Sequence, residues 1–236
     1  DGPGRSPTAT FTAATMPTPA QVDALAELLA TRTPIVAVET HDERRFTALM
    51  ALLAQRSQRE VWQWSASRGL RVAHNLRLAL TERGSDTLGT DAAATRELPA
   101  ALAAVEKLKG DPLVMLLDIH PYLSNPVVQR ALKELALSTE ARGLQLLFIG
   151  HDIALPDELA PYASRFELEP MTPARIKTLF SEELHNRRLR SGGDLAGERA
   201  TLDSLIRHMV GLPEAAVRQM VRSTLADGRI CTADLA

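Results

Sequence analysis

The stretch Leu113-Val114-Met115-Leu116-Leu117-Asp118-Ile119-His120 decides the fold of this chain. Five consecutive apolar residues are typical of a strand that is buried on both faces, as strands of parallel sheets are. Asp118 would then lie at the carboxyl edge of the strand, where a carboxylate can orient Mg²⁺ for phosphoryl transfer. Hydrolysis would normally need a second carboxylate next to it to activate water, and that residue is Ile119. The stretch predicts a parallel α/β sheet and leaves its chemical role open.

Four further apolar runs predict additional strands of the same sheet. Amphipathic helices separate the runs, and crossovers of that length join parallel strands. We therefore expect an α/β fold with a five-stranded parallel sheet, its strands at residues 35–39, 60–65, 112–118, 144–150 and 165–168.

Helical patterns precede and separate these strands. Pro19 opens the first helix, and longer patterns cover residues 42–55, 96–109 and 126–142. Asn125 and Pro126 start the last of these helices, and Gly143 ends it. Residues 68–95 show no clear periodicity, and for them we expect a helix near residues 72–80 followed by a loop.

The strand pattern ends near residue 170. Residues 1–18 are rich in Pro, Thr, Ala and Gly and predict a disordered lead. The α/β domain then covers residues 19–170. Residues 171–236 predict three helices, at 173–188, 196–209 and 213–226. This order of elements is similar to that of an AAA-type ATPase with its C-terminal helical lid subdomain, an analogy of fold alone.

The composition is that of an ordinary folded protein. Of 236 residues, 45% are hydrophobic and 24% charged, and the net charge of −2 gives no overall attraction to nucleic acid or an anionic membrane. The single Cys231 excludes an intramolecular disulfide, and no apolar run is long enough to cross a bilayer. Since a signal-peptide pattern is also absent, we expect a cytoplasmic protein without membrane contact.

The segment after the first predicted strand lacks a phosphate-binding loop. Such a loop needs Gly-rich backbone, a Lys for the terminal phosphates and a Ser or Thr for Mg²⁺. The segment is Val38-Glu39-Thr40-His41-Asp42-Glu43-Arg44-Arg45, which contains neither Gly nor Lys. Its acidic residues would repel a triphosphate. We therefore assign no catalytic residue and no cofactor to this chain.

Three motifs resemble a known family. They are Pro34-Ile35-Val36-Ala37-Val38-Glu39-Thr40-His41-Asp42-Glu43, Val61-Trp62-Gln63-Trp64-Ser65-Ala66-Ser67-Arg68-Gly69-Leu70 and Asp118-Ile119-His120-Pro121-Tyr122-Leu123. Together they are similar to the N-terminal half of a bacterial and plastid-encoded two-domain AAA ATPase family. In that family a degenerate AAA-like domain without nucleotide-binding motifs precedes a domain that carries them. The resemblance spans about residues 20–236. It implies that ATP and Mg²⁺ bind only in a following AAA domain.

Several polar residues follow predicted strands, at the edge where open α/β sheets bind ligands. They are Glu39, Asp118, His120, His151 and Asp152. These side chains could form a metal site of imidazoles and carboxylates. The plainer alternative is that Thr40 or Asp42 caps a helix and that the histidines bond loop backbone. No spacing motif supports a metal, so Asp118, His120 and His151 are kept only as remnants of a nucleotide site.

Arg165 is a further remnant candidate. It precedes a predicted strand where related ATPases carry an arginine that reaches a neighbouring subunit's nucleotide, although a solvated side chain is the plainer alternative. Trp62 and Trp64 point to one side of a strand and could stack on a base, but packing beneath helices is commoner. The stretch Arg187-Arg188-Leu189-Arg190 could bind phosphate or complement a helix dipole.

These patterns favour a non-catalytic AAA-like module of a two-domain ATPase, which serves assembly or the docking of a protein client. Its partners would be other proteins, its own catalytic AAA domain or further copies of itself. One alternative is an active nucleotide hydrolase with an unorthodox site near Asp118 and His120. Another is a loader-type helper that binds nucleic acid through Trp62, Arg68, Arg71 and the Arg187 cluster.

Overall fold

The computed structural model describes residues 17–73, 92–191, 196–197, 199–226 and 229–230. They belong to two compact units, Pro17–Leu168 and Glu169–Ala236, and each unit is described by itself. Most of the predicted disordered lead lies outside the described residues. At its end, Thr18 accepts a hydrogen bond from the Gln21 backbone and caps the first helix.

The first unit is built on a six-stranded sheet in the order β3-β2-β4-β5-β1-β6. The strands are β1 (Ile35–Glu39), β2 (Val61–Ser65), β3 (Gly69–Val72), β4 (Leu113–Leu117), β5 (Gln145–Gly150) and β6 (Ala163–Glu167). All neighbouring pairs are parallel except β2 and β3, which are antiparallel. The five predicted parallel strands are therefore confirmed, but the sheet is mixed and has six strands.

The helix expected near residues 72–80 is wrong at Val72, which ends the additional strand β3. Residues 74–91 lie outside the described residues. Gly69 lies in the left-handed region (φ +68°), which lets the chain turn back after β2. Thr95 then holds the hairpin, because its hydroxyl accepts from the Leu70 N–H at 2.8 Å while its carbonyl accepts from Trp64 Nε1 at 2.8 Å.

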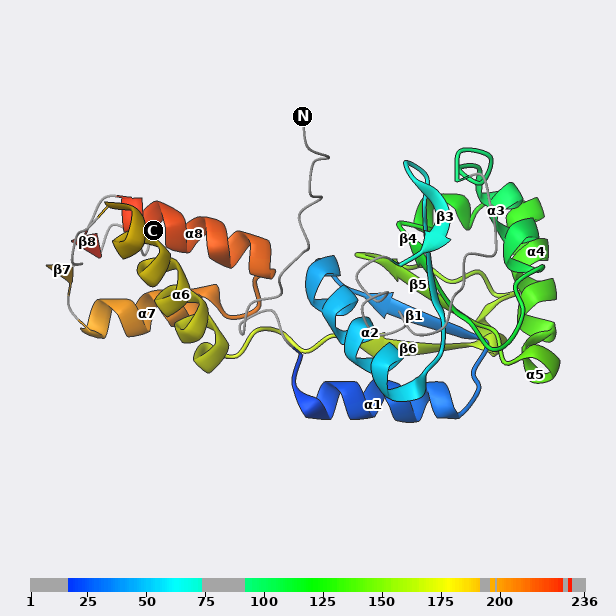
Figure 1. Ribbon diagram of the computed structural model, residues 1–236, viewed down its shortest axis with the longest axis horizontal. Coiled ribbons are helices and arrows are strands. Elements are labelled where there is room, and N and C mark those ends of the chain that lie inside the picture. The colour runs from blue at the N-terminus through cyan, green and yellow to red at the C-terminus, as the bar shows by residue number, and fades with distance from the viewer. Residues whose placement is uncertain (1–16, 74–91, 192–195, 198, 227–228, 231–236) are drawn as a thin grey trace, which may run out of the picture. The chain divides into compact units, whose positions relative to one another are not determined.

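Helices cover both faces of the sheet (Figure 1). On one face α1 (Pro19–Ala30) and α2 (Glu43–Ser57) contribute to a hydrophobic cluster that includes Leu25, Phe46 and Leu49. On the other face α3 (Leu98–Val105) and α4 (Pro126–Leu137) pack in a second cluster. The helix predicted over residues 126–142 is in fact α4 followed by the short α5 (Thr139–Arg142), which ends at left-handed Gly143.

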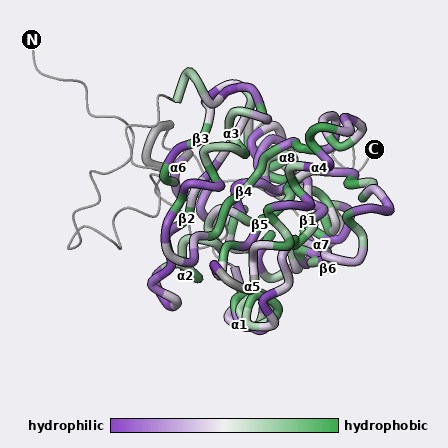
Figure 2. The backbone as a smooth tube through the Cα atoms, turned by 90° about the vertical axis from the view of Figure 1, so that its right-hand side faces the viewer, coloured by the Kyte–Doolittle hydropathy of each residue, from purple (hydrophilic) through white to green (hydrophobic). Residues whose placement is uncertain are grey.

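The central strand β4 belongs to both clusters. Leu113, Met115 and Leu117 point to the α1–α2 face, and Val114 and Leu116 point to the α3–α4 face. Figure 2 shows the resulting hydrophobic colour along the middle of the sheet. Because β4 is buried on both faces, it can be neither an edge strand nor a surface strand.

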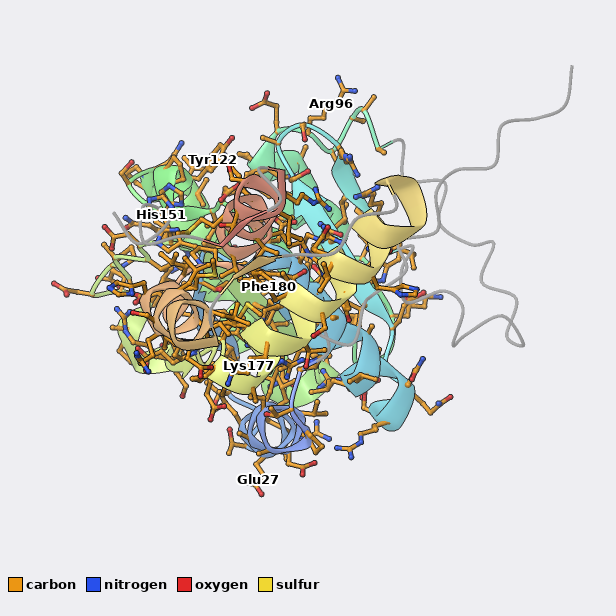
Figure 3. All side chains as sticks on the ribbon, turned by 90° about the vertical axis from the view of Figure 1, so that its left-hand side faces the viewer. Glu27, Arg96, Tyr122, His151, Lys177 and Phe180 are labelled. Atoms are coloured by element: carbon orange, nitrogen blue, oxygen red, sulfur yellow. The ribbon has the colours of Figure 1, made fainter. Side chains whose placement is uncertain are left out.

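The second unit contains α6 (Pro173–Ser191), α7 (Arg199–Met209) and α8 (Glu214–Ala226), with a parallel pair of short strands, β7 (Ala196–Gly197) and β8 (Arg229–Ile230). The helices share a core that includes Ile176, Phe180 and Val221. Figure 3 labels the buried Phe180 and, on the same helix, the exposed Lys177. In neither unit does a described helix have the length and apolar composition needed to span a membrane.

A buried ion network joins α6 to α8. Glu183 is 7% exposed and accepts hydrogen bonds from Arg218 at 3.0 Å and from Arg222 at 3.0 and 3.1 Å. Burial alone would raise the pKa of Glu183, but the hydrogen bonds from Arg222 and Arg218 outweigh burial and hold that pKa below its ordinary value.

Glu183→Gln tests this network. At about pH 7 we expect the free energy of unfolding to fall by about 1–2 kcal/mol, because charged hydrogen bonds are lost. Because its pKa is depressed, ionised Glu183 stabilises the fold at pH values above the ordinary Glu pKa of about 4.3. This stabilisation is lost as the pH falls through the depressed pKa. The difference between variant and wild type should therefore shrink in acid. Glu134→Gln, at an exposed position on α4, is the control, and an equal loss there would contradict the assignment.

Gly143 offers a second test, because a Cβ there would lie 2.7 Å from Asp111 Cβ, whereas a Cβ at Gly110 would meet nothing within 4 Å. Both residues have positive φ (+69° and +78°), so either alanine costs about 1 kcal/mol of backbone strain. Gly143→Ala should lose about 1–3 kcal/mol more than Gly110→Ala in urea unfolding. Equal losses of stability in the two variants would show that the chain avoids the clash between the new Cβ and Asp111 at no cost in free energy.

Candidate functional site

A cavity of about 190 Å³ lies at the carboxyl edge of β1, β4 and β5. Helix α2 leaves β1 on one face and α4 follows β4 on the other, so the cavity occupies the position where open α/β sheets bind ligands. It is lined by Thr40, His41, Glu43, Leu117, Asp118, Ile149, Gly150 and His151.

Backbone hydrogen bonds hold the three strand ends together. The Thr40 N–H donates to the Gly150 carbonyl at 2.7 Å, and the Asp118 N–H donates to the Ile149 carbonyl at 2.8 Å. Asp118 itself has a φ of +50°, a left-handed conformation that Asp tolerates better than most residues. The chain therefore turns sharply as soon as β4 ends.

The residue after Asp118 faces away from this cavity. Ile119 is fully buried (0% exposed) in the hydrophobic cluster on the α3–α4 face. A glutamate side chain in that conformation would place an ionised carboxylate in an apolar core, at a cost of several kcal/mol. The position that should activate water thus belongs to the core.

Three histidine rings gather beside the cavity. The His151 ring, labelled in Figure 3, lies 4.8 Å from that of His120 and 5.6 Å from that of His41, measured between centroids. The Nδ1 atom of His120 is buried and makes no hydrogen bond within the described part of the chain. A Cβ on Gly150 would come within 3.2 Å of this nitrogen, so glycine leaves room for the ring.

Two carboxylates give the cavity its electrostatic character. Burial raises the pKa of Glu43, the negative charge of Asp118 raises it further, and Arg68 partly opposes both effects. The first turn of α2 therefore carries an acidic side chain that faces like charge. A phosphate placed there would add a third anion.

The residues of the alternative metal site are not grouped as metal ligands. Among the residues that the structure describes, no three His, Cys, Asp or Glu side chains are grouped so as to hold a metal ion. Asp152 is exposed and does not line the cavity. The His120 and His151 rings meet edge to face, with an interplanar angle of 78°, and the described residues show no hydrogen bond from either ring to loop backbone.

Arg165 lies in the middle of β6 rather than before it, and its register partner is Ala37 of β1. Its guanidinium forms an ion pair with Glu39 and donates to the Ile153 carbonyl at 3.3 Å. In this structure the Arg165 side chain is 58% exposed and pairs with the end of β1 within its own chain.

The aromatic pair of β2 packs inside the unit, which confirms the commoner of its two predicted roles. Trp62 is 3% and Trp64 0% exposed, so neither can stack on a base as the nucleic-acid alternative required. The edge of Tyr122 packs against Trp64. The side chains of the Arg187 cluster lie outside the described residues.

His41 and the proximity of Glu43 to Asp118 were not predicted from the sequence. A signal was present for His41, because it follows a strand end by two residues, much as His151 follows β5. The proximity of Glu43 to Asp118 left no pattern in the sequence, because it depends on how α2 leaves the sheet.

A family model described as SpoVK-like AAA ATPase, N-terminal domain, matches residues 21–168. No curated protein matches the chain. A RuvB variant from Thermotoga maritima has a similar structure, with a TM-score of 0.53 and 12% identity over 92% of this chain and 65% of that one. A DNA replication initiation factor also has a similar structure, with a TM-score of 0.53 and 13% identity over 88% of this chain and 59% of that one. The chain thus spans less than two thirds of either relative.

A third similar structure is that of a HORMA:CdnC:Trip13 complex from E. coli MS115-1, with a TM-score of 0.51 and 14% identity over 88% of this chain and 81% of that one. At these identities the three structures establish the fold alone, that of the AAA P-loop ATPases.

Glu43→Gln tests the acidic pair. A carboxyl group with a raised pKa destabilises the fold once the pH exceeds the ordinary pKa of that group. The variant should therefore be more stable than wild type at about pH 7 and only slightly more stable at about pH 4. Unfolding in urea at several pH values measures this. The gain should be smaller when Asp118 is replaced by Asn, because asparagine also tolerates the positive φ of this position but carries no negative charge. The same gain in both backgrounds would mean that Asp118 does not contribute.

Proposed function

The chain belongs to the SpoVK-like AAA ATPase N-terminal domain family, and we propose that it is a non-catalytic AAA-type module, which serves assembly or the docking of a protein partner without binding ATP. The observation that carries the proposal is the chemistry of the cavity at the carboxyl ends of β1, β4 and β5. Its lining holds no lysine for the phosphates, and the helix that starts there begins with an acidic residue.

A phosphate site in this fold uses the N–H groups and positive dipole at the start of the helix that follows β1. In this chain α2 starts with the acidic Glu43, preceded by Asp42. The Asp42 N–H donates to the Thr40 hydroxyl at 2.9 Å, so this donor is already used. The helix start thus carries two acidic residues, which disfavour a bound phosphate.

None of the residues that line the cavity is a lysine or an arginine. The cations nearest in sequence are Arg44 and Arg45, and Arg45 is 3% exposed and pairs with Asp42 at 3.6 Å. The missing clamp matters because electrostatic stabilisation of the transferred phosphoryl group supplies most of the catalysis in this class. Since Ile119 lies in the core, the cavity offers neither a cation to bind the phosphates nor the second carboxylate that would activate water.

The remaining role is structural. We assign the helical unit α6–α8 to the lid of an AAA-type module, and we propose that the module acts through contacts with neighbours. We assign ATP and Mg²⁺ to a following AAA domain, as the family resemblance implies, and we assign to this module contacts with that domain, with other copies or with a client.

Turnover of ATP by the purified chain tests the proposal. We expect phosphate release at background level, with no change in Asp118→Ala or in Asp118→Asn, which keeps the backbone conformation. Turnover that Asp118→Ala reduces by about a hundredfold or more, the effect typical of losing an electrostatic catalytic group, would favour the hydrolase alternative instead.

A further inference from the structure

The larger cavity of the first unit lies at the opposite edge of the sheet. It has a volume of about 430 Å³ and is enclosed by the ends of α1 and α2 and by the residues that precede β2, β4 and β5. This volume lies in the range of pockets that hold small molecules. Its apolar wall includes the buried Leu29 and Leu53, and its polar rim includes Arg32, Arg56, Arg59 and Asp111.

Arg59 is fixed in place at this rim. Its Nε donates to the Asp111 carbonyl at 2.7 Å, Nη1 to Gln145 Oε1 at 2.6 Å and Nη2 to the Gly143 carbonyl at 2.8 Å. Gln145 is itself buried, and its amide donates to the Leu29 and Thr33 carbonyls. A guanidinium has five N–H donors, so two of them remain available.

Arg32 stands where a glycine would be the usual residue. It follows the C-cap of α1 with a φ of +57°, a left-handed conformation that costs a residue with a side chain roughly 1 kcal/mol. Its Nη1 atom lies 3.5 Å from the Cβ position of Gly143, whose carbonyl already binds Arg59. Within the described residues, the Arg32 guanidinium has no hydrogen bond or ion pair. The chain thus holds a free cation beside a fixed one.

The charges at the rim leave one positive charge uncompensated. Arg56 pairs with Asp23 at 2.5 Å, and Arg59 lies 3.5 Å from an Asp111 carboxylate oxygen, which leaves Arg32. Burial lowers the pKa of Arg59, nearby Asp111 partly restores it, and the positive charge of Arg32 lowers it again. A single negative charge between the two arginines would relieve this repulsion, whereas a dianion would also face Asp111.

We propose that this cavity binds a small monocarboxylate with an apolar chain. The carboxylate lies between Arg32 and Arg59, and the chain packs against Leu29 and Leu53. Such a ligand supplies what the cavity lacks, which is one negative charge at the rim and apolar atoms against the wall. This inference does not depend on whether the opposite edge of the sheet binds nucleotide.

Calorimetric titration of the full chain with octanoate tests the site, with octanol and octyl phosphate as comparison ligands. We expect saturable binding of octanoate, and weaker binding of octanol and of the dianionic phosphate. Arg32→Gln should weaken octanoate binding about tenfold or more, because it removes a charged hydrogen bond. Arg130→Gln, at an exposed position on α4 outside the cavity, should bind like wild type.

Ala30→Trp provides a second variant, which should block the cavity from its exposed wall without removing an arginine. Retained folding of all variants is checked by circular dichroism. The proposal is overturned if wild type does not bind octanoate saturably, if octanol or octyl phosphate binds as tightly, or if Arg32→Gln or Ala30→Trp leaves binding unchanged.

Discussion

The burial of β4 on both faces is the constraint on which the first unit depends. Each of its five side chains enters one of two hydrophobic clusters, and full burial of a Leu, Val or Met side chain stabilises the fold by about 1.5–3 kcal/mol. A shift of one residue would exchange the two sets of side chains between α1–α2 and α3–α4. The strand therefore cannot slip, and Asp118 must lie at the carboxyl edge where β4 ends.

The chemistry of that edge follows from the same constraint. Since β4 ends at Leu117, the chain must turn at Asp118 before Ile119 returns to the core on the α3–α4 face. Asp118 then lies near enough to Glu43 for its charge to raise the pKa of that side chain. At the opposite edge of the sheet Arg32 follows the end of α1, and within the described residues its guanidinium forms no hydrogen bond or ion pair.

Elements with strong local patterns could be predicted from the sequence, and those set by tertiary contacts could not. The central strands β1, β4 and β5 are nearly continuous apolar runs, and the Asn125 cap and the Gly143 stop are local signals. Strand β3 has only four residues and depends on Thr95 from a distant segment. At the candidate site, strand order alone placed Asp118, His120 and His151 at one edge. The pairing of Arg165 with Glu39 depends on the register of β6 against β1, which no local pattern contains.

The account rests on the claim that the carboxyl edge of this sheet does not bind nucleotide. The most direct measurement is the thermal unfolding midpoint of the full chain with and without saturating ATP and Mg²⁺. A ligand at about 100 times its Kd stabilises the folded state by about 2.7 kcal/mol. The account predicts no shift of the midpoint. A rise of several degrees that Asp118→Ala abolishes would contradict it.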